Sequence, residues 1–309
     1  MIRGVPAEQS AGRSPLPSAG DYVGRFAPSP TGALHLGSLV AALGSYLDAR
    51  RNNGSWLVRM EDLDTARAVP GCSAEILRTL ELFGLQWDGE VEYQSRRTER
   101  YAAALETLKS NHLTFECSCT RRQVLNTGDT GYPGTCRSGP ARPGPTATRF
   151  RVPEGSVQFA DTLQGPCQFD LGALGDPVVR RRDGVLSYQL AVVVDDAQQG
   201  ITHVVRGADL LDSTAWQIAL QRALGFATPR YSHLPLILEP QRGKLAKSRH
   251  SLAIAAAAPA PQLIAALQLL QHPPPAEAAH ASTRELLAWA TDSWQPQRLY
   301  GLRNVTFHT

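Results

Sequence analysis

The clearest hydrophobic pattern in the chain lies near its start. Residues 23–26 form a short apolar run typical of a buried strand, and two prolines and a glycine within residues 28–32 force a turn after it. Apolar residues then recur at helical spacing over residues 39–47, and Gly54 follows the predicted helix end. The pattern therefore predicts a strand, a tight loop and a helix.

The alternation of strand and helix continues downstream. Residues 55–61 have the pattern of a buried strand that ends in acidic residues, and residues 75–83 and 96–111 have the pattern of amphipathic helices. Alternating strands and helices predict an α/β fold with a doubly wound, Rossmann-like parallel sheet. Ligands of such sheets bind at the carboxyl ends of the strands, which is where Glu61 lies.

This rhythm breaks between residues 114 and 183. A cysteine cluster, a Gly/Pro-rich loop at residues 139–145 and short strand-like pieces such as residues 148–152 replace it. We interpret this stretch as an α+β insertion between the two halves of the sheet.

The α/β pattern resumes at residues 188–196, and a strand is predicted at residues 201–206. A helix is predicted at residues 213–224, capped by Ser213 or Thr214 and closed by Gly225. Two further helices are predicted near the end of the chain, on either side of a run of prolines, at residues 261–271 and 282–294.

These patterns divide the chain into five parts. They are a disordered extension at residues 1–20, a Rossmann-like first half at 21–112, the insertion at 113–184, a second half at 185–255 and a small helical region at 256–309.

Composition narrows the class of protein. The apolar content of 42% and the charged content of 19% fit a globular protein, and the net charge of +3 permits nucleic-acid binding without requiring it. No apolar run reaches the roughly 18 residues that a membrane span needs. The Ser/Pro/Gly/Ala-rich first twenty residues lack the apolar core of a secretory signal. We therefore expect a cytoplasmic protein without a membrane or protein partner.

The helix that starts after the first turn has His35 and Gly37 at its entrance. Free backbone N–H groups and the positive end of the helix dipole at such a position favour a phosphate. A histidine before a helix is by itself more often a capping or packing residue. A glycine-led loop far downstream, however, carries Lys244 and Lys247 three residues apart. The chain contains neither a P-loop nor a G-x-G-x-x-G motif, so a nucleotide would need this other arrangement.

Four charged or polar residues are predicted at strand ends of one sheet: Arg25, Glu61, Tyr188 and Arg206. An arginine can bind a carboxylate through two hydrogen bonds, and Glu61 can hold an ammonium group. A lone arginine is usually part of a salt bridge. The four together instead favour a site for an acidic amino acid.

The five cysteines include a cluster, Cys117, Cys119 and Cys136. Their odd number argues against a disulfide framework, and three thiolates suit a structural zinc ion. Tyr132 and His112 both remain candidates for a fourth ligand, whereas Cys72 and Cys167 are expected to be ordinary buried thiols. Arginines concentrate in the same insertion, where they would contact a phosphate backbone or simply form a solvated face: Arg121, Arg122, Arg137, Arg142, Arg149, Arg151 and Arg180 to Arg182.

Several of these segments resemble the catalytic core of glutamyl-tRNA synthetases, which are class I aminoacyl-tRNA synthetases with HIGH and KMSKS motifs. The resemblance covers residues 22–251, and its most specific segments are residues 25–32, 57–62, 188–196, 206–209 and the lysine loop 243–248. Ser38 replaces the last histidine of HIGH, and Ala246 replaces the serine of the KMSKS consensus. Residues 249–309 are too few for an anticodon-binding domain, so the chain is most similar to the short paralogues that lack one.

The resemblance implies ATP-dependent activation of L-glutamate without tRNA, followed by transfer of glutamate to queuosine at the wobble position of tRNA(Asp). It places Arg25, Phe26, Ala27, Pro28, Ser29, Glu61, Tyr188 and Arg206 at glutamate, and His35, Gly37 and Lys247 at ATP with its Mg²⁺. His35, Gly37, Lys244 and Lys247 would be catalytic. It also favours Tyr132 as the fourth zinc ligand. A truncated glutamyl-tRNA synthetase, a small-molecule nucleotidyltransferase and a non-catalytic tRNA-binding relative are the alternatives.

Overall fold

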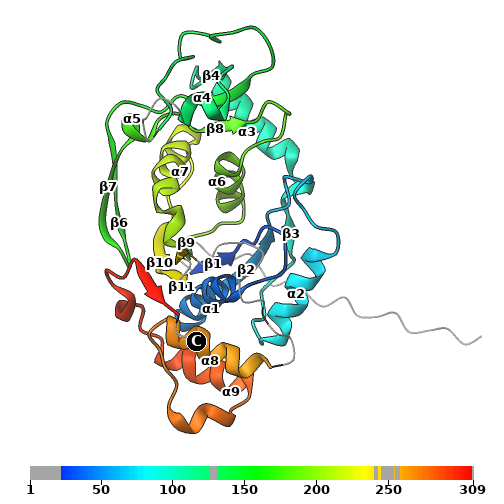
Figure 1. The fold of residues 1–309 in the computed structure, drawn as a ribbon, viewed down its shortest axis with the longest axis vertical. Coiled ribbons are helices and arrows are strands. Elements are labelled where there is room, and N and C mark those ends of the chain that lie inside the picture. The colour runs from blue at the N-terminus through cyan, green and yellow to red at the C-terminus, as the bar shows by residue number, and fades with distance from the viewer. Residues whose placement is uncertain (1–21, 126–130, 240–242, 245–253, 255–257, 308–309) are drawn as a thin grey trace, which may run out of the picture.

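The computed structural model describes residues 22–125, 131–239, 243–244, 254 and 258–307 (Figure 1). The predicted extension at residues 1–20 lies outside this part of the chain. So do Ala246 and Lys247 of the lysine loop.

The first half of the chain forms the predicted parallel sheet. β1 (Val23–Phe26) pairs with β2 (Ser55–Met60), and β2 pairs with β3 (Glu92–Tyr93). α1 (Leu36–Arg51) connects β1 to β2, and α2 (Cys72–Leu82) connects β2 to β3. Glu61 therefore lies directly past the carboxyl end of β2.

A second group of strands continues beside β1. β9 (His203–Gly207) pairs in parallel with β10 (Arg230–Leu234), and the N–H of Thr202 donates to the carbonyl oxygen of Val23 at 3.0 Å. β6 (Ser156–Asp161) pairs in parallel with β10 through Asp161 and Tyr231, and β7 (Gly165–Asp170) is antiparallel to β6. This hairpin from the predicted insertion therefore extends the sheet of the second half.

The rest of the insertion forms its own small sheet at one end of the molecule (Figure 1). It follows α3 (Thr98–Ser110), which lies close to the predicted range. The sheet is antiparallel and is accompanied by two short helices; its elements are β4 (Thr114–Cys117), β5 (Ala147–Phe150), β8 (Val178–Arg180), α4 (Arg121–Leu125) and α5 (Leu171–Leu174).

The prediction that Tyr188 lies at a strand end is wrong. Tyr188 is the first residue of α6 (Tyr188–Gln198), which packs beside α7 (Leu211–Leu224) between the insertion and the parallel sheet (Figure 1). The apolar run 190–194 is buried on every side of this helix. A continuous apolar run does not by itself separate a buried strand from a buried helix, which explains the error.

The predicted cap of α7 is also wrong. The helix begins at Leu211 after a 3-10 turn at Ala208–Leu210, and Leu210 is its N-cap residue without a side-chain capping bond. Its predicted end is confirmed, because Gly225 closes it in the left-handed conformation with φ of 70°.

The C-terminal part packs against α1 at the end of the molecule opposite the insertion (Figure 1). α8 (Pro259–Leu269) and α9 (Thr283–Ser293) occupy nearly the predicted ranges, and Ser282 caps α9. β11 (Leu236–Glu239) pairs with β12 (Gly243–Lys244) and with β13 (Asn304–Thr306). Within the described residues, no helix is both long enough and apolar enough to cross a membrane.

Candidate active site

The entrance of α1 is built around the His35 side chain. His35 is the N-cap residue, and its Nδ1 accepts a hydrogen bond from the backbone N–H of Ser38 at 3.2 Å. A Cβ atom on residue 37 would come 3.2 Å from both Nδ1 and Cε1 of the His35 ring. Glycine at position 37 therefore lets the ring lie against the first turn of the helix.

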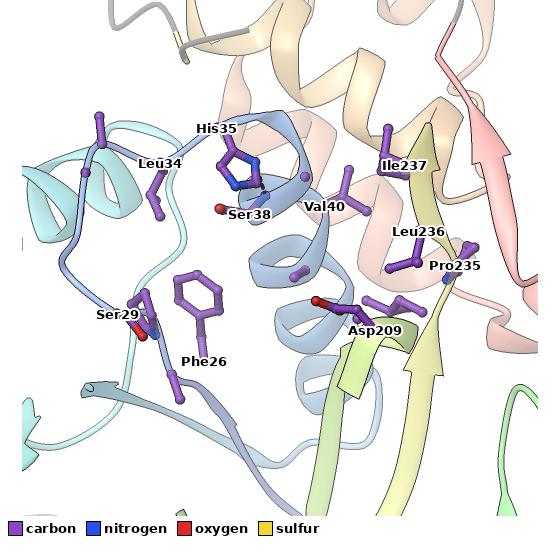
Figure 2. A pocket seen from close by; sticks show the side chains of 18 residues that line it. Phe26, Ser29, Leu34, His35, Ser38, Val40, Asp209, Pro235, Leu236 and Ile237 are labelled. Atoms are coloured by element: carbon purple, nitrogen blue, oxygen red, sulfur yellow. Dashed lines mark hydrogen bonds between the residues drawn. The ribbon is translucent and has the colours of Figure 1, made fainter. Parts of the chain in front are cut away.

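A cavity of about 410 Å³ opens at this entrance. Figure 2 shows His35 at the entrance of α1 and Ser38 in its first turn on one side of it, and Pro235, Leu236 and Ile237 of the β10–β11 segment on the opposite side, with Asp209 at its lower edge. Its lining includes six residues predicted for the site, namely Phe26, Ala27, Pro28, Ser29, His35 and Gly37. Its volume is that of an ordinary small-molecule site.

Of the two predicted lysines, the structure describes Lys244 but not Lys247. Lys244 lies on β12, opposite Leu238 of β11, and β11 contributes Leu236 and Ile237 to the wall of the cavity. The backbone of Lys244 is therefore one strand away from that wall. Lys247 lies outside the described residues, so its part in the site stays a prediction.

A smaller cavity of about 160 Å³ adjoins the first through Ser29, which lines both. It also contains Glu61, Asp62 and Asp64. The N–H of Glu61 donates to the carbonyl oxygen of Pro28 at 2.9 Å, which ties the end of β2 to the loop after β1. Two predicted groups of residues, the loop 26–29 and Glu61, are thereby brought together.

Arg25 was predicted to bind a substrate carboxylate, but in the structure it already has a carboxylate partner. Its guanidinium pairs with Asp196 at 3.3 Å, and both side chains are almost fully buried. Arg59, which is completely buried, pairs with the same carboxylate at 2.8 Å and approaches Glu61 at 3.6 Å. Burial alone would raise the pKa of Asp196, but Arg25 and Arg59 outweigh burial and hold it below its usual range.

Asp195 extends this charged cluster toward α3. Its carboxylate accepts hydrogen bonds from Gln94, Arg97 and Tyr101 at 2.8–2.9 Å and lies 3.6 Å from Arg59. Arg59, Asp195 and Asp196 were not among the residues predicted for the site. The sequence contains one indication of them, because each is a charged residue within or at the end of an otherwise apolar buried run.

Arg206 differs from Arg25. Its Nη1 donates to the hydroxyl of Tyr188 at 3.3 Å, so the structure brings these two predicted residues together. Within the described residues, Arg206 forms no ion pair with a carboxylate. Burial raises the pKa of Tyr188, on which the charges of Arg206, Glu61 and Arg25 all act. The four predicted residues therefore share one electrostatic environment.

Glu61 faces the two buried arginines but is poorly compensated. Its Oε1 is buried without a hydrogen-bond partner among the described residues. Burial raises the pKa of Glu61 to about 7, although Arg59 and Arg25 act in the opposite direction. An ammonium group placed at this carboxylate would restore the missing interaction.

The three clustered cysteines converge in the insertion. The Sγ atoms of Cys117, Cys119 and Cys136 all lie within 4.8 Å of one another, and those of Cys119 and Cys136 are 3.6 Å apart. Ligand sulfurs around tetrahedral zinc lie about 3.7 Å apart for Zn–S bonds of about 2.3 Å, so this set fits a metal ion. The hydroxyl of Tyr132 lies 3.4 Å from Cys117 Sγ, whereas His112 is not a member of the cluster.

Several arginines of the predicted basic patch have structural partners instead. Arg137 forms a two-bond ion pair with Asp176, Arg151 donates to the carbonyl oxygen of Arg137, and Arg149 lies 3.8 Å above the ring of Tyr132. Arg121, Arg122 and Arg142 are exposed. The patch available to a partner is therefore smaller than the sequence suggested.

Comparisons with known proteins agree with this architecture. Residues 22–258 match the family model of the catalytic domain of class I tRNA synthetases (E and Q). A glutamate-tRNA synthetase from Elizabethkingia anophelis superposes with a TM-score of 0.77 at 26% identity, over 93% of this chain and 68% of that one. A glutamate tRNA ligase from Elizabethkingia meningosepticum, solved with its amino acid, superposes with a TM-score of 0.75 at 26% identity, over 93% and 67%.

Curated relatives are more similar in sequence. The glutamyl-Q tRNA(Asp) synthetase of Pseudomonas aeruginosa is 52% identical over 90% of this chain and 95% of its own length. The enzymes of the same name from Thiobacillus denitrificans and Geobacter sulfurreducens are 52% and 50% identical, over 93% and 90% of this chain and 95% and 93% of their own lengths. The chain therefore belongs to the glutamyl-Q tRNA(Asp) synthetases, ligases built on the catalytic domain of the glutamyl-type class I aminoacyl-tRNA synthetases.

Proposed function

We propose that this protein activates L-glutamate with ATP, without tRNA, and transfers the glutamyl group to queuosine at the wobble position of tRNA(Asp). The names of its curated relatives support this substrate pair. The family to which the chain belongs supports the general reaction, in which an amino acid, ATP and a tRNA take part.

The observation that carries the proposal is the contrast between Arg206 and Glu61. Arg206 is a buried cation without a carboxylate partner among the described residues, and Glu61 has a buried Oε1 that lies 3.6 Å from Arg59 but has no hydrogen-bond partner among those residues. A ligand with a carboxylate and an ammonium group would satisfy both, because each buried charge gains an opposite partner. Tyr188 would add a hydrogen bond beside Arg206. Arg25 is already paired with Asp196, so it would attract the ligand carboxylate more weakly than Arg206 does.

The proposed nucleotide site is the cavity at the entrance of α1. His35 and the backbone N–H groups at the start of α1 would face the phosphates of ATP, and Gly37 lets the nucleotide approach the backbone. Lys244 and Lys247 would stabilise negative charge on the α-phosphate during the reaction, with Mg²⁺ bound to ATP. The roles of both lysines are carried over from the family motif.

The chemistry proceeds in two steps. A carboxylate oxygen of glutamate attacks the α-phosphorus, and pyrophosphate leaves with the P–O bonding electrons, which gives glutamyl-adenylate. A hydroxyl of the queuosine cyclopentenediol then attacks the glutamyl carbonyl, AMP leaves, and an ester forms. Donors held ready for the developing charge lower both barriers.

The insertion would hold a structural zinc ion through Cys117, Cys119, Cys136 and Tyr132. When bound, zinc would cross-link this loop-rich segment. The exposed Arg121, Arg122 and Arg142 would contact the tRNA phosphates.

The first test is glutamate-dependent exchange of pyrophosphate into ATP without tRNA, followed by transfer to queuosine-containing tRNA(Asp), to the same tRNA without queuosine, and to tRNA(Glu). Exchange without tRNA and transfer only to the queuosine form are expected. Exchange that requires tRNA(Glu) would instead indicate a shortened glutamyl-tRNA synthetase. The complete absence of glutamate-dependent exchange would favour a small-molecule nucleotidyltransferase.

Arg206→Lys tests the carboxylate site directly. Lysine keeps the charge but loses the forked geometry, so we expect KM for glutamate to rise about 10- to 100-fold while KM for ATP changes little. Arg230→Lys, at an exposed position on the neighbouring strand β10, is the matched control and should behave like the unchanged protein. Equal kinetics of the two variants would remove Arg206 from the glutamate site.

A further inference from the structure

A buried histidine connects Arg206 to the end of the β6–β7 hairpin. His233 of β10 is completely buried, and its Nδ1 lies 2.6 Å from Oδ2 of Asp161, the last residue of β6. On the other side of the ring, Nε2 lies 3.2 Å from Nε of Arg206. The three side chains form one continuous chain of contacts in which Asp161 and Arg206 are also buried.

The orientation of the Asp161 carboxylate is set by the backbone. Its Oδ1 accepts three N–H groups, those of Leu163 at 2.9 Å, Gln164 at 2.8 Å and His233 at 3.1 Å. Its Oδ2 is thereby left to face Nδ1 of His233. Because a carboxylate only accepts hydrogen bonds, Nδ1 must carry the imidazole proton.

The tautomer of His233 then determines whether its Nε2 atom can accept a hydrogen bond from Arg206. With the proton on Nδ1, a neutral ring presents a lone pair at Nε2, which can accept the N–H of Arg206 Nε at 3.2 Å and also faces the hydroxyl of Thr214 at 3.0 Å. Burial lowers the pKa of His233, the bond to Asp161 opposes this, and the charge of Arg206 lowers the pKa further, with a net decrease. The neutral ring is therefore the favoured form near neutral pH.

The remaining donors of Arg206 are also directed. Nη2 donates to Thr214 Oγ1 at 2.7 Å and to the carbonyl oxygen of Leu210 at 3.5 Å, and Nη1 donates to the hydroxyl of Tyr188 at 3.3 Å. A guanidinium has five N–H groups. Four of them have acceptors among the described residues, which leaves one hydrogen on Nη1, on the side of Tyr188.

We propose that Asp161 and His233 are positioning residues for amino-acid binding. Asp161 selects the tautomer of His233, and His233 holds the guanidinium of Arg206 so that its remaining Nη1 hydrogen faces the substrate carboxylate. Neither residue touches the substrate. The inference rests on the proposed function, because it assumes that Arg206 binds the carboxylate of glutamate.

Asp161→Asn keeps the shape of the side chain next to His233 but changes which of its atoms donate and accept hydrogen bonds. The asparagine Oδ1 can keep the three backbone N–H groups, which places the Nδ2 amide hydrogens against His233 Nδ1. The imidazole proton must then move to Nε2, where it can donate to Thr214 Oγ1 but where the ring can no longer accept the N–H of Arg206. We expect KM for glutamate to rise about 10- to 100-fold, the scale of one lost hydrogen bond to a charged group, and KM for ATP to stay within about 2-fold.

The position of the imidazole proton on His233 can be measured separately. It would not change if Asp161 had only a structural role. Two-bond ¹H–¹⁵N correlation spectra of histidine-labelled protein should show His233 with its proton on Nδ1 in the unchanged chain and on Nε2 in Asp161→Asn. Asp170→Asn is the control, because Asp170 ends the partner strand β7, is exposed, and caps α5 through bonds that asparagine can also accept. It should leave both the tautomer and KM unchanged.

Two variants of the histidine keep the test decisive should Asp161→Asn fail to fold. His233→Gln can place an acceptor oxygen near Arg206, whereas His233→Asn can place only a donor near Asp161. KM for glutamate should therefore be at least about 5-fold lower in the glutamine variant.

Equal KM values in the two histidine variants, an unchanged tautomer in Asp161→Asn, or a changed tautomer with an unchanged KM would each overturn the positioning role. Absence of glutamate-dependent exchange in the unchanged protein would overturn the proposed function instead.

Discussion

At the scale of single residues, the site depends on an imbalance of buried charge. Arg59 is completely buried and lies within 3.6 Å of the carboxylates of Glu61, Asp195 and Asp196. Asp196 is shared with Arg25, and Asp195 is satisfied by hydrogen bonds. Glu61 has the weakest compensation, and its pKa of about 7 reflects this. A carboxyl group in this position can respond to a cationic ligand at neutral pH.

Glu61 gives a prediction for stability. Its pKa is about 7 in the folded protein and about 4.3 in an unfolded chain. Between these values the folded state keeps a proton that the unfolded chain has released, so the free energy of unfolding falls as pH rises, by about 4 kcal/mol in total. Glu61→Gln should remove this decline in urea unfolding series between pH 5 and 8. The exposed Glu81→Gln should retain it, and identical pH slopes for all three proteins would contradict the assigned pKa.

At the scale of elements, the first turn of α1 combines a structural task with a proposed functional one. His35 caps the helix through Ser38 and also lines the cavity, so the capping interpretation and the site interpretation of this residue are compatible. Gly37 is the second residue of that helix, where alanine would be the better helix former. Its presence is explained by the His35 ring rather than by helix stability.

Gly37→Ala should therefore weaken ATP binding while changing the stability of the fold little. The helix would gain up to about 1 kcal/mol of stability from the alanine, offset by displacement of the His35 ring. KM for ATP should rise about 10-fold or more, because the ring and the added methyl group alter the floor of the cavity. KM for glutamate is the internal control. A variant in which KM for ATP stays unchanged would show that position 37 does not limit nucleotide binding.

At the scale of the whole molecule, the insertion and the helical C-terminal part occupy opposite ends, and the parallel sheet lies between them (Figure 1). The cysteine cluster has a small core of its own with Phe115 and Tyr132, separate from the two larger cores. The β6–β7 hairpin links the insertion to the sheet and brings Asp161 to His233. The cysteine cluster and the cavity at His35 share no lining residue among the described ones.

Cys136→Ser should separate activation from transfer. We expect the unchanged protein to contain about one zinc ion per chain and the variant to contain much less, measured by elemental analysis of purified protein. Pyrophosphate exchange should stay within about 2-fold, whereas transfer to tRNA should fall about 10-fold or more. Cys167→Ser, outside the cluster, is the control. A parallel loss of exchange and transfer would show that the insertion supports the fold of the catalytic half.

Periodicity located β1, β2 and β9 but not β3 or β10, which complete the parallel pairings. The strands β1, β2 and β9 and the helices α1, α2 and α3 lie at or near their predicted ranges, because alternation of apolar segments with turn residues is a local property of the chain. Glycine and proline also located the helix ends, as at Gly225. The family motifs identified the loop 25–29, Glu61, Tyr188 and Arg206 as candidate residues for binding glutamate.

The tertiary structure decided what these residues meet. Tyr188 begins a helix rather than ending a strand, because burial on all sides erases the periodic signal. Arg25 is paired with Asp196, and Arg206 is held by His233, across 171 and 27 positions of sequence respectively. Such pairings arise from strand order and helix packing. The sequence by itself therefore determined the elements and the kinds of chemistry, and only the packing of the strands and helices decided which charges remain available for a substrate.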